Sequence, residues 1–503
     1  MKIVSYIKSN HYKVLFFTLL FGLIIYKLKF LNLPFFWDES WVYAPSLRMM
    51  HDNGPSMMPN VIPVEYSRGH PLLFHFLGGV WLKIFGTSLI SFHSFALFIS
   101  VLVIIALFFF TRAFFNEKIA LLSSFLLMTL QMFIIQSSFV LPEMLLTLWM
   151  LCSVYTFFLK KWWWFILSST ALLLTKESGL ALIAAYFFYL IIIIPFIDKS
   201  ITIKERLKMI GIVFIPVLIA FIWFLIQHIK MGWFLFPEHL GMMTFKLREI
   251  YDKIGSFFTF VFNREGRLVL IIPLILLLLQ SILKRIFIRH CEFTKQSILI
   301  VRLLHFVRND GKIKFDNSKA PFVVFTIIFI LIYFVFSSLN FFTLRYLLVL
   351  FPLVFVVISY YLIKIFEIFK PYLAIVIITI YISINAYEQW TSGVHDCNRH
   401  YVDLVYSQKQ LIDYLRIENK ANLKTYASFV FCTNMGSYYS GYVKKGDEIY
   451  VTNDLNDTTT RYYVYNNMEN AAFEEDTIIS KGVTLIKVIN YSKAWVKVYK
   501  KNN

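Results

Sequence analysis

Residues 88–110 read SLISFHSFALFISVLVIIALFFF, a run without a single Asp, Glu, Lys or Arg. About 20 apolar residues let a helix cross the hydrocarbon core of a bilayer, because a helix satisfies its own backbone hydrogen bonds in lipid. Similar blocks recur along the chain, for example at Phe322–Phe336 and Leu373–Ile384. This pattern predicts an all-α polytopic membrane protein and argues against a large soluble helical core.

The composition of the whole chain agrees with a membrane protein. Of its 503 residues 58% are hydrophobic and 19% aromatic, whereas soluble domains contain roughly 45–50% apolar residues. The net charge of +19 could indicate nucleic acid, but Lys and Arg lie mostly in short segments between the apolar blocks. Beside a bilayer such residues set orientation and contact anionic headgroups. We therefore expect membrane lipids, and no nucleic acid, as partners.

Apolar periodicity and the charges that interrupt it predict about eleven transmembrane helices. The most basic connections, 199–208 and 284–319, fall on the same side as the N-terminus, which the positive-inside rule makes cytoplasmic. An odd number of spans then places the tail outside. The richness in Ile, Lys, Phe, Tyr and Asn suggests an AT-rich bacterial genome, and we expect the protein in the inner membrane of a bacterium. The predicted spans are 13–31, 88–110, 119–136, 143–159, 162–175, 178–195, 209–227, 267–283, 320–338, 346–363 and 371–388.

Three segments differ from the pattern of long apolar spans joined by short connections. Residues 162–195 are long for one helix and short for two, and the charge rule favours two short spans that turn at Glu177–Gly179. The first external loop, 32–87, is divided by prolines, and its apolar runs are too short to span, so they are expected along the membrane surface. The stretch 284–319 differs in composition from its surroundings, and we expect no catalytic role there.

The chain divides by composition into a membrane domain, 1–390, and a polar extracytoplasmic domain, 391–503, for which we expect a small α/β fold. Cys397 and Cys432 lie in the second domain, where a disulfide and two free thiols are both open. The expected elements are a helix near Val402–Ile417 and strands at Thr425–Phe431, Glu448–Thr452, Arg461–Tyr465 and Thr484–Tyr499.

Ionisable residues collect at the outer ends of the predicted spans, and the centres of the spans are nearly free of charge. The segment FWDESWVYA at the start of the first loop is the densest cluster. Its carboxylates, Asp38 and Glu39, could take the proton of an attacking hydroxyl, and Trp37, Trp41 and Tyr43 could stack on a sugar. Alternatively, Asp38 caps a short helix and the tryptophans belong to the interfacial belt.

A second cluster, with Tyr66, Arg68 and His70, precedes Pro71. Arg68 or His70 could meet an anionic group, or the cluster could only start a helix at the interface.

Three further residues lie at the same outer face. Glu143 could simply favour a helix N-terminus, Lys176 could pair with Glu177, and Arg345 could extend to the interface. Together, carboxylates and cations on one face suit a lipid-phosphate leaving group, because the cations stabilise the charge that develops on the phosphate. No Walker motif, dinucleotide loop, zinc-type spacing or Gly-x-Ser-x-Gly occurs, so nucleotide-dependent chemistry has no visible site.

These motifs, in this order, resemble the GT-C class of polytopic glycosyltransferases, and within it the protein O-mannosyltransferase, aminoarabinose transferase and RgtA/B/C/D-like group. The resemblance covers about residues 13–390. The motifs that carry it are Trp37-Asp38-Glu39-x-x-x-Tyr43, Gly69-His70-Pro71-Leu72, Pro142-Glu143, Leu174–Gly179 and Arg345-Tyr346-Leu347-Leu348.

The resemblance implies a sugar donor on a polyprenyl phosphate and transfer with inversion on the extracytoplasmic side. Asp38 matches the family's catalytic aspartate, accompanied by Glu39, and Lys176 and Arg345 match positions near the donor phosphate. The family often has two prolines where this chain has Pro71-Leu72, and some members have lysine in place of His70. Metal use varies within the class, so no metal ligand is assigned and a divalent metal stays open.

We therefore predict a glycosyltransferase that transfers a hexosyl or pentosyl group to a lipid, glycan or protein acceptor of the cell envelope. Arg68 and His70 join Lys176 and Arg345 as candidates for the donor phosphate, and Tyr66 and Glu143 join the aromatic residues as candidate substrate contacts. Two alternatives are a transporter or flippase of lipid-linked sugars and an inactive scaffold. The scarcity of charges inside the spans argues against the transporter.

Overall fold

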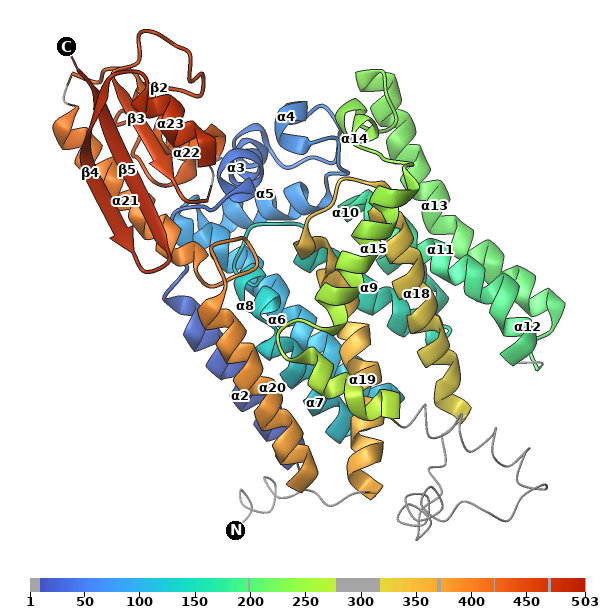
Figure 1. The fold of residues 1–503 in the computed structure, drawn as a ribbon. Helices are drawn as coiled ribbons and strands as arrows, with labels where there is room; N and C mark the ends of the chain where they lie inside the picture. Colours follow the sequence, from blue (N-terminus) through green and yellow to red (C-terminus); the bar gives the residue numbers. More distant parts are fainter. Residues whose placement is uncertain are drawn as a thin grey trace.

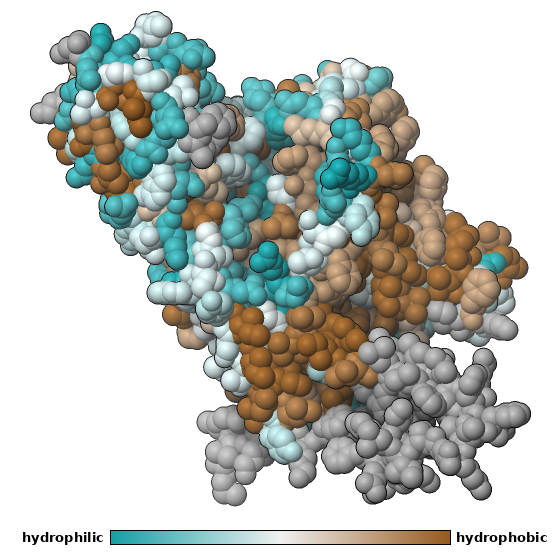
Figure 2. All heavy atoms as spheres, in the orientation of Figure 1, coloured by the Kyte–Doolittle hydropathy of each residue, from teal (hydrophilic) through white to brown (hydrophobic). Residues whose placement is uncertain are grey.

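The protein consists of a long helical bundle and a small C-terminal α/β region at one end of it (Figure 1). This confirms the predicted fold class. Figure 2 shows hydrophobic side chains gathered over the helices at the right and bottom of the view, whereas the C-terminal region is largely hydrophilic. The structure is a computed structural model that describes residues 10–197, 200–276, 317–368, 372–419, 421–468 and 472–502.

Seven helical runs in these described ranges are long and apolar enough to cross a membrane, and each coincides with a predicted span. Two of them are composite: η2 (Glu177–Gly179), α11 (Leu180–Phe188), η3 (Tyr189–Ile193) and α12 (Ile194–Ile197) follow one another, as do η5 (Leu344–Leu350) and α19 (Phe351–Ile368). The seven runs are α2 (His11–Leu28), α6 (Leu89–Phe114), Glu177–Phe196, α13 (Ile203–Met231), α18 (Ala320–Leu339), Leu344–Glu367 and α20 (Tyr372–Thr391).

The other four predicted spans are shorter helices. The first of these spans is broken at Leu130, whose extended backbone (φ −64°, ψ 119°) separates two helices. Helix α9 is buried along most of its length, so other helices rather than lipid surround it. Length and hydropathy therefore support seven of the eleven predicted spans. The shorter helices are α7 (Glu117–Thr129) with α8 (Gln131–Gln136), α9 (Glu143–Phe158), α10 (Trp162–Thr175) and Arg267–Leu276.

The predicted turn between the fifth and sixth spans is confirmed. Helix α10 ends at Thr175, Lys176 is extended (φ −162°, ψ 142°), and η2 starts the next helical run. The basic stretch 284–319 lies, except for η4 (Asn317–Lys319), outside the described residues, and so does Cys291.

The first loop folds over one end of the bundle as η1 (Glu39–Tyr43), α3 (Ala44–Asn53), α4 (Val64–Ser67) and α5 (Leu73–Phe85). The two apolar runs predicted to lie along the membrane surface form the single helix α5, which crosses the bundle axis in Figure 1. The second loop, residues 228–266, contains α14 (Pro237–Gly241) and the amphipathic helix α15 (Leu247–Phe262).

Helices α3 and α5 approach each other closely at Gly79. A β-carbon at Gly79 would lie 2.6 Å from Cγ of Met50 and 3.3 Å from its backbone carbonyl carbon. We expect Gly79→Val to destabilise the protein by about 1–3 kcal/mol, because overpacking displaces α3. Thermal unfolding in detergent measures this. Gly211→Val in α13, where a β-carbon meets nothing within 4 Å, is the matched control, and an equal loss in both variants would contradict the packing argument.

The C-terminal region begins with α21 (Tyr401–Glu418), as predicted, and contains one mixed five-stranded sheet of order β2-β1-β3-β5-β4. Strand β1 pairs in parallel with β2 and β3, and β5 pairs antiparallel with β3 and β4. Helix α23 (Ala472–Ile479) precedes β4. The strands are β1 (Thr425–Tyr426), β2 (Val451–Thr452), β3 (Tyr462–Asn466), β4 (Val483–Tyr491) and β5 (Ala494–Lys501).

The predicted strand Thr425–Phe431 is wrong in its second half. The strand ends at Tyr426, and α22 (Phe429–Gly436) and η6 (Tyr438–Ser440) follow. The ring of Phe429 packs edge-on against Trp41 of the first loop, 5.0 Å between ring centroids. A tertiary contact thus overrides the strand propensity of the aromatic residues.

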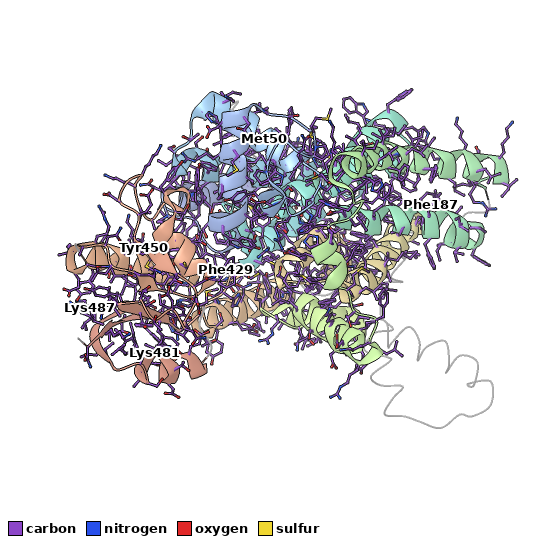
Figure 3. The ribbon with its side chains drawn as sticks, turned by 90° about the horizontal axis from the view of Figure 1, so that it is seen from above. Met50, Phe187, Phe429, Tyr450, Lys481 and Lys487 are labelled. Carbon is purple, nitrogen blue, oxygen red and sulfur yellow. The ribbon has the colours of Figure 1, made fainter. Side chains whose placement is uncertain are left out.

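The C-terminal region rests on the first loop. The amide of Phe35 donates to the carbonyl of Ser440 over 3.1 Å, next to the contact between Phe429 and Trp41. Seen from above, Lys487 and Lys481 of the C-terminal region lie at one side of the molecule and Phe187 of α11 at the other (Figure 3). The first loop therefore contacts the C-terminal region on one side, while it lies on the end of the bundle (Figure 1).

Candidate active site

The segment that carries Asp38 is held in an unusual backbone conformation. Trp37 has a φ of 50°, and the π-helix η1 follows directly after Asp38. A non-glycine residue in the left-handed region costs about 1–3 kcal/mol, and such residues cluster at functional sites. The strained turn presents Asp38 to the end of the bundle.

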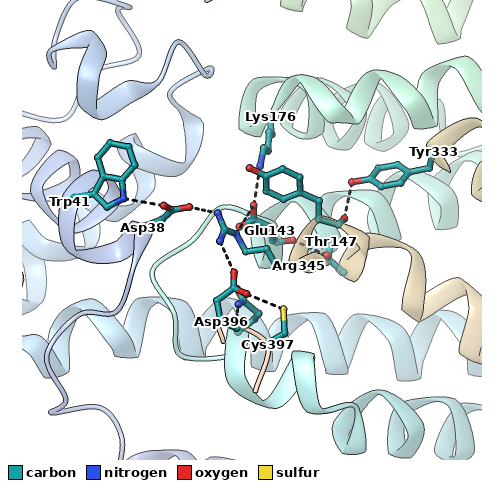
Figure 4. Close-up of polar contacts among 11 residues, drawn as sticks. Asp38, Trp41, Glu143, Thr147, Lys176, Tyr333, Arg345, Asp396 and Cys397 are labelled. Atoms are coloured by element: carbon teal, nitrogen blue, oxygen red, sulfur yellow. Dashed lines mark hydrogen bonds and ion pairs between the residues drawn. The ribbon is translucent and has the colours of Figure 1, made fainter. Parts of the chain in front are cut away.

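One guanidinium organises the site. Arg345, at the start of η5, is 3% exposed. Its Nη2 donates to Oδ2 of Asp38, and its Nη1 donates to Oδ2 of Asp396 over 2.6 Å. Its Nε lies 3.9 Å from Oε1 of Glu143. Figure 4 shows the three carboxylates around this one cation.

A second buried cation completes the cluster. Nζ of Lys176 donates to Oε1 of Glu143 over 2.9 Å and lies 3.6 Å from the ring centroid of Tyr346. Burial alone would lower the pKa of Lys176, but the carboxylate of Glu143 outweighs it and raises that pKa. Lys176 is therefore charged at neutral pH. Three carboxylates face two cations, so the cluster can accept a proton without an excess of positive charge.

Two aromatic residues named from the sequence join this cluster. The indole Nε1 of Trp41 donates to Oδ1 of Asp38 over 3.0 Å. Tyr43 is buried, and burial, together with the charge of Glu143, raises the pKa of its phenol well above 10. Tyr43 therefore stays neutral. Asp38 keeps 20% of its side chain exposed, so a substrate can reach the one carboxylate that both Trp41 and Arg345 orient.

Glu39 is turned away from the cluster. It is 1% exposed, and its carboxylate accepts hydrogen bonds from the backbone amides of Phe36 and Val140 over 3.1 and 2.7 Å. Nε2 of His93 lies 3.5 Å from it. The prediction that Glu39 accompanies Asp38 in the chemistry does not match this placement, because its oxygens join the loop to α6 and to the segment before α9.

Arg68 is also remote from the cluster. Its guanidinium pairs with Glu238 of α14 and lies over the rings of Trp41 and Phe236, 5.4 and 5.2 Å from their centroids. It joins the first loop to the second. Trp37 and Tyr66 are half-buried, and in the part of the chain that the structure describes neither forms a hydrogen bond with Asp38 or Arg345.

An apolar cavity of about 290 Å³ adjoins the cluster. Lys176 and Tyr346 belong to both, and the walls come from α11, α14, α18 and the segment before η5. Nδ1 of His70 lies at its edge, 2.7 Å from Oε2 of Glu177. Burial, with the charge of His70 second, lowers the pKa of the neighbouring His239 to about 4, so His239 is neutral at pH 7. Among the lining residues are Leu180, Phe236, Leu240, Tyr333, Phe336 and Phe341.

Asp396 is the member of the site that the sequence did not reveal. It follows α20 in the connection to the C-terminal region, 51 residues after Arg345. No motif surrounds it, and a carboxylate in a polar connection carries no signal of its own. Only the tertiary structure brings it to Arg345.

A metal ion is usually held by three or more His, Cys, Asp or Glu side chains. In the described ranges one such group, His395, Asp396 and Cys397, has its potential ligand atoms within 4.8 Å of one another. Arg345 already binds Asp396, and burial, with the charge of Asp396 second, raises the pKa of Cys397 well above 9. A neutral thiol beside a guanidinium does not suit a divalent cation, so we assign no metal. Cys397 and Cys432 are both free thiols, which removes the disulfide from the two alternatives.

Residues 13–231 match the family of dolichyl-phosphate-mannose-protein mannosyltransferases. The match includes Asp38, Glu143 and Lys176 and stops before Arg345 and Asp396. It confirms the resemblance to the GT-C class that was drawn from the ordered motifs.

Two solved structures of ArnT from Cupriavidus metallidurans share the fold. The apo structure has a TM-score of 0.55 and covers 98% of each chain, and the structure bound to undecaprenyl phosphate has a TM-score of 0.52 and covers 97% of this chain and 98% of ArnT. Both are 12% identical in sequence to this chain, so the similarity establishes the fold. No curated protein sequence matches the chain.

Proposed function

We propose that this protein transfers a sugar from a polyprenyl-phosphate donor to an acceptor of the bacterial cell envelope, with inversion, on the extracytoplasmic face of the inner membrane. In the topology predicted from the sequence, the most basic connections fall on the side of the N-terminus, and the positive-inside rule makes that side cytoplasmic. The acceptor is a lipid, a glycan or a protein that offers a nucleophilic oxygen.

The observation that carries the proposal is the junction of the charged cluster with the apolar cavity at Lys176. A polyprenyl-phosphate sugar combines a hydrocarbon chain, an anionic phosphate and a polar sugar. The cavity suits the first of these, and Lys176, at its inner end, suits the phosphate. The undecaprenyl phosphate bound to ArnT in its crystal structure supports the same class of donor.

In the proposed reaction the acceptor oxygen attacks the anomeric carbon while the bond from that carbon to the phosphate oxygen breaks. The proton of the acceptor passes to Asp38. The bonding electron pair leaves with the polyprenyl phosphate, whose charge Lys176 stabilises. Arg345 holds the carboxylate of Asp38 in place.

His70 and Arg68, the other two residues named for the donor phosphate, differ in whether they can reach it. His70 lies at the edge of the cavity and can approach a phosphate there. Arg68 is occupied by Glu238, and we propose that it fixes α14 over the cavity. Tyr43 and Trp41 remain candidate contacts of the sugar, and Glu143 positions Lys176.

The direct test is sugar transfer by the purified protein in detergent, with a panel of polyprenyl-phosphate sugars and an envelope extract. Product formed in detergent supports a transferase and excludes a pure transporter, because transport has no meaning without a sealed membrane. If a broad panel gives no product with folded protein, the proposal fails in favour of a transporter or a scaffold.

The cavity makes a prediction about the donor. We expect Leu240→Trp to raise the KM for a long-chain polyprenyl-phosphate sugar about tenfold and to leave kcat nearly unchanged, because it narrows the cavity without touching the charged cluster. Steady-state kinetics at several donor concentrations measures both constants. Leu247→Trp, in the same loop but outside the cavity, is the control, and an equal change in both variants would argue against the cavity as the donor site.

A further inference from the structure

A second cavity, of about 240 Å³, lies at the outer end of α2, against α8 and the first turn of α21. It shares no lining residue with the apolar cavity beside Lys176. Three of its lining residues are cations, Lys27, Lys29 and Arg399, and one, Asp403, is an acid. Its chemistry is therefore that of an anion site.

Lys27 is 1% exposed. Its ammonium donates to the carbonyl of Ile134 over 2.8 Å and lies 5.2 Å from the ring centroid of Phe30. An ammonium has three N–H groups, and this carbonyl is its one hydrogen-bond acceptor among the described residues. An anion that approaches such a buried amine stabilises its charged form and can accept its spare N–H groups.

The other charged residues of the cavity supply no anion for the spare N–H groups of Lys27. Lys29 and Arg399 are exposed, and neither has an ion-pair partner in the described ranges. The carboxylate of Asp403 already has a partner, because its Oδ2 lies 2.6 Å from Nδ1 of His400. Three cations therefore face the cavity against one carboxylate that already has a partner.

The cavity lies at the ends of two candidate membrane spans, where lipid headgroups are expected. Lys27 and Lys29 sit at the end of α2, and the guanidinium of Arg399 lies over the ring of Trp390 at the end of α20. Both helices are candidate membrane spans that end on the same side of the bundle (Figure 1). Both also present apolar side chains outwards below this point, among them Phe21, which is 64% exposed, and Ile375, which is 68% exposed. Tyr26 and Trp390 add the aromatic residues typical of an interface.

We infer that this cavity binds the phosphate-bearing headgroup of an anionic membrane lipid, whose acyl chains lie along the exposed faces of α2 and α20. The phosphate meets Lys27, Lys29 and Arg399, and the apolar stripe below them explains why the ligand is a lipid and not a soluble anion. The site is distinct from the proposed donor site and does not depend on the transferase proposal.

The test is native mass spectrometry of the full-length protein in detergent with added phosphatidylglycerol. We expect Lys29→Ala/Arg399→Ala to bind this lipid about 30-fold more weakly than the unaltered protein, because a basic residue near the membrane surface contributes about 1 kcal/mol and two are lost. Phosphatidylcholine, whose choline cancels the phosphate charge, should bind weakly to both. Since both altered residues are exposed, thermal unfolding should confirm that the variant folds.

Lys230→Ala/Arg248→Ala is the matched control. It removes one exposed Lys and one exposed Arg from the second external loop and its border, away from the cavity. Phosphatidylglycerol binding that is unchanged in Lys29→Ala/Arg399→Ala, or equally reduced in the control, would overturn the inference. Displacement of the lipid by millimolar inorganic phosphate would overturn the assignment to a lipid and leave a soluble anion as the ligand.

Discussion

Replacement of Asp38 by Asn should lower the rate of sugar transfer by about 10²–10⁴, the range for loss of a general base. The amide keeps the size of the side chain and can still accept from Trp41, so the fold should survive. It cannot take up the proton of the acceptor, and it removes the charge that Arg345 holds in place. The measurement is product formation with saturating donor, so that the loss appears in kcat.

Asp52→Asn is the control for Asp38→Asn. Asp52 lies in the last turn of α3 in the same loop, and 57% of its side chain is exposed. We expect normal transfer by this variant. If Asp38→Asn transfers sugar at the full rate while its thermal unfolding is normal, Asp38 is not the base, and the role assigned to the strained turn at Trp37 is wrong.

Replacement of Arg345 by Met should be the most destabilising single change at the site. Removal of one partner of a buried ion pair typically costs about 3–5 kcal/mol, because the remaining charge stays buried without compensation. Here Asp38, Asp396 and Glu143 all lose the same guanidinium. The midpoint of thermal unfolding in detergent should fall sharply, and transfer should be lost with it.

Two further variants separate the role of Arg345 from the general effect of losing an arginine. Arg345→Lys restores one charge but not the fork that holds two carboxylates, so its stability should lie between that of the protein and that of Arg345→Met. Arg416→Met breaks an ion pair with Asp447 in which both side chains are more than one-third exposed, and such pairs contribute about 0–1 kcal/mol. Equal losses of stability in Arg345→Met and Arg416→Met would contradict the central role of Arg345.

Much of the helical architecture follows from the sequence alone. Uninterrupted apolar runs such as 88–110 and 320–338 predict α6 and α18 closely, because lipid permits few alternatives to a helix for such a segment. The break at Glu177–Gly179 was also predictable, since charge and glycine interrupt the apolar pattern there. The short helices inside the bundle were harder to judge, because protein rather than lipid surrounds them and their length no longer follows the thickness of a bilayer.

For the candidate site, too, the sequence predicted one part and not the other: it indicated single residues but not the contacts between them. The sequence identified Asp38, Glu143, Lys176 and Arg345 individually, because charged residues are rare in so apolar a chain. It could not show that Arg345 and Asp38, 307 residues apart, share a hydrogen bond.

Local sequence alone determined where the seven long apolar helices lie and which rare charges lie near their ends, because lipid imposes that choice one segment at a time. The tertiary structure decided which of those charges meet. It turned Glu39 inward to backbone amides, bound Arg68 to Glu238, and brought Asp396 to Arg345. These outcomes depend on how separate elements pack, and the pairing of buried charges is settled only when the whole bundle excludes water from them.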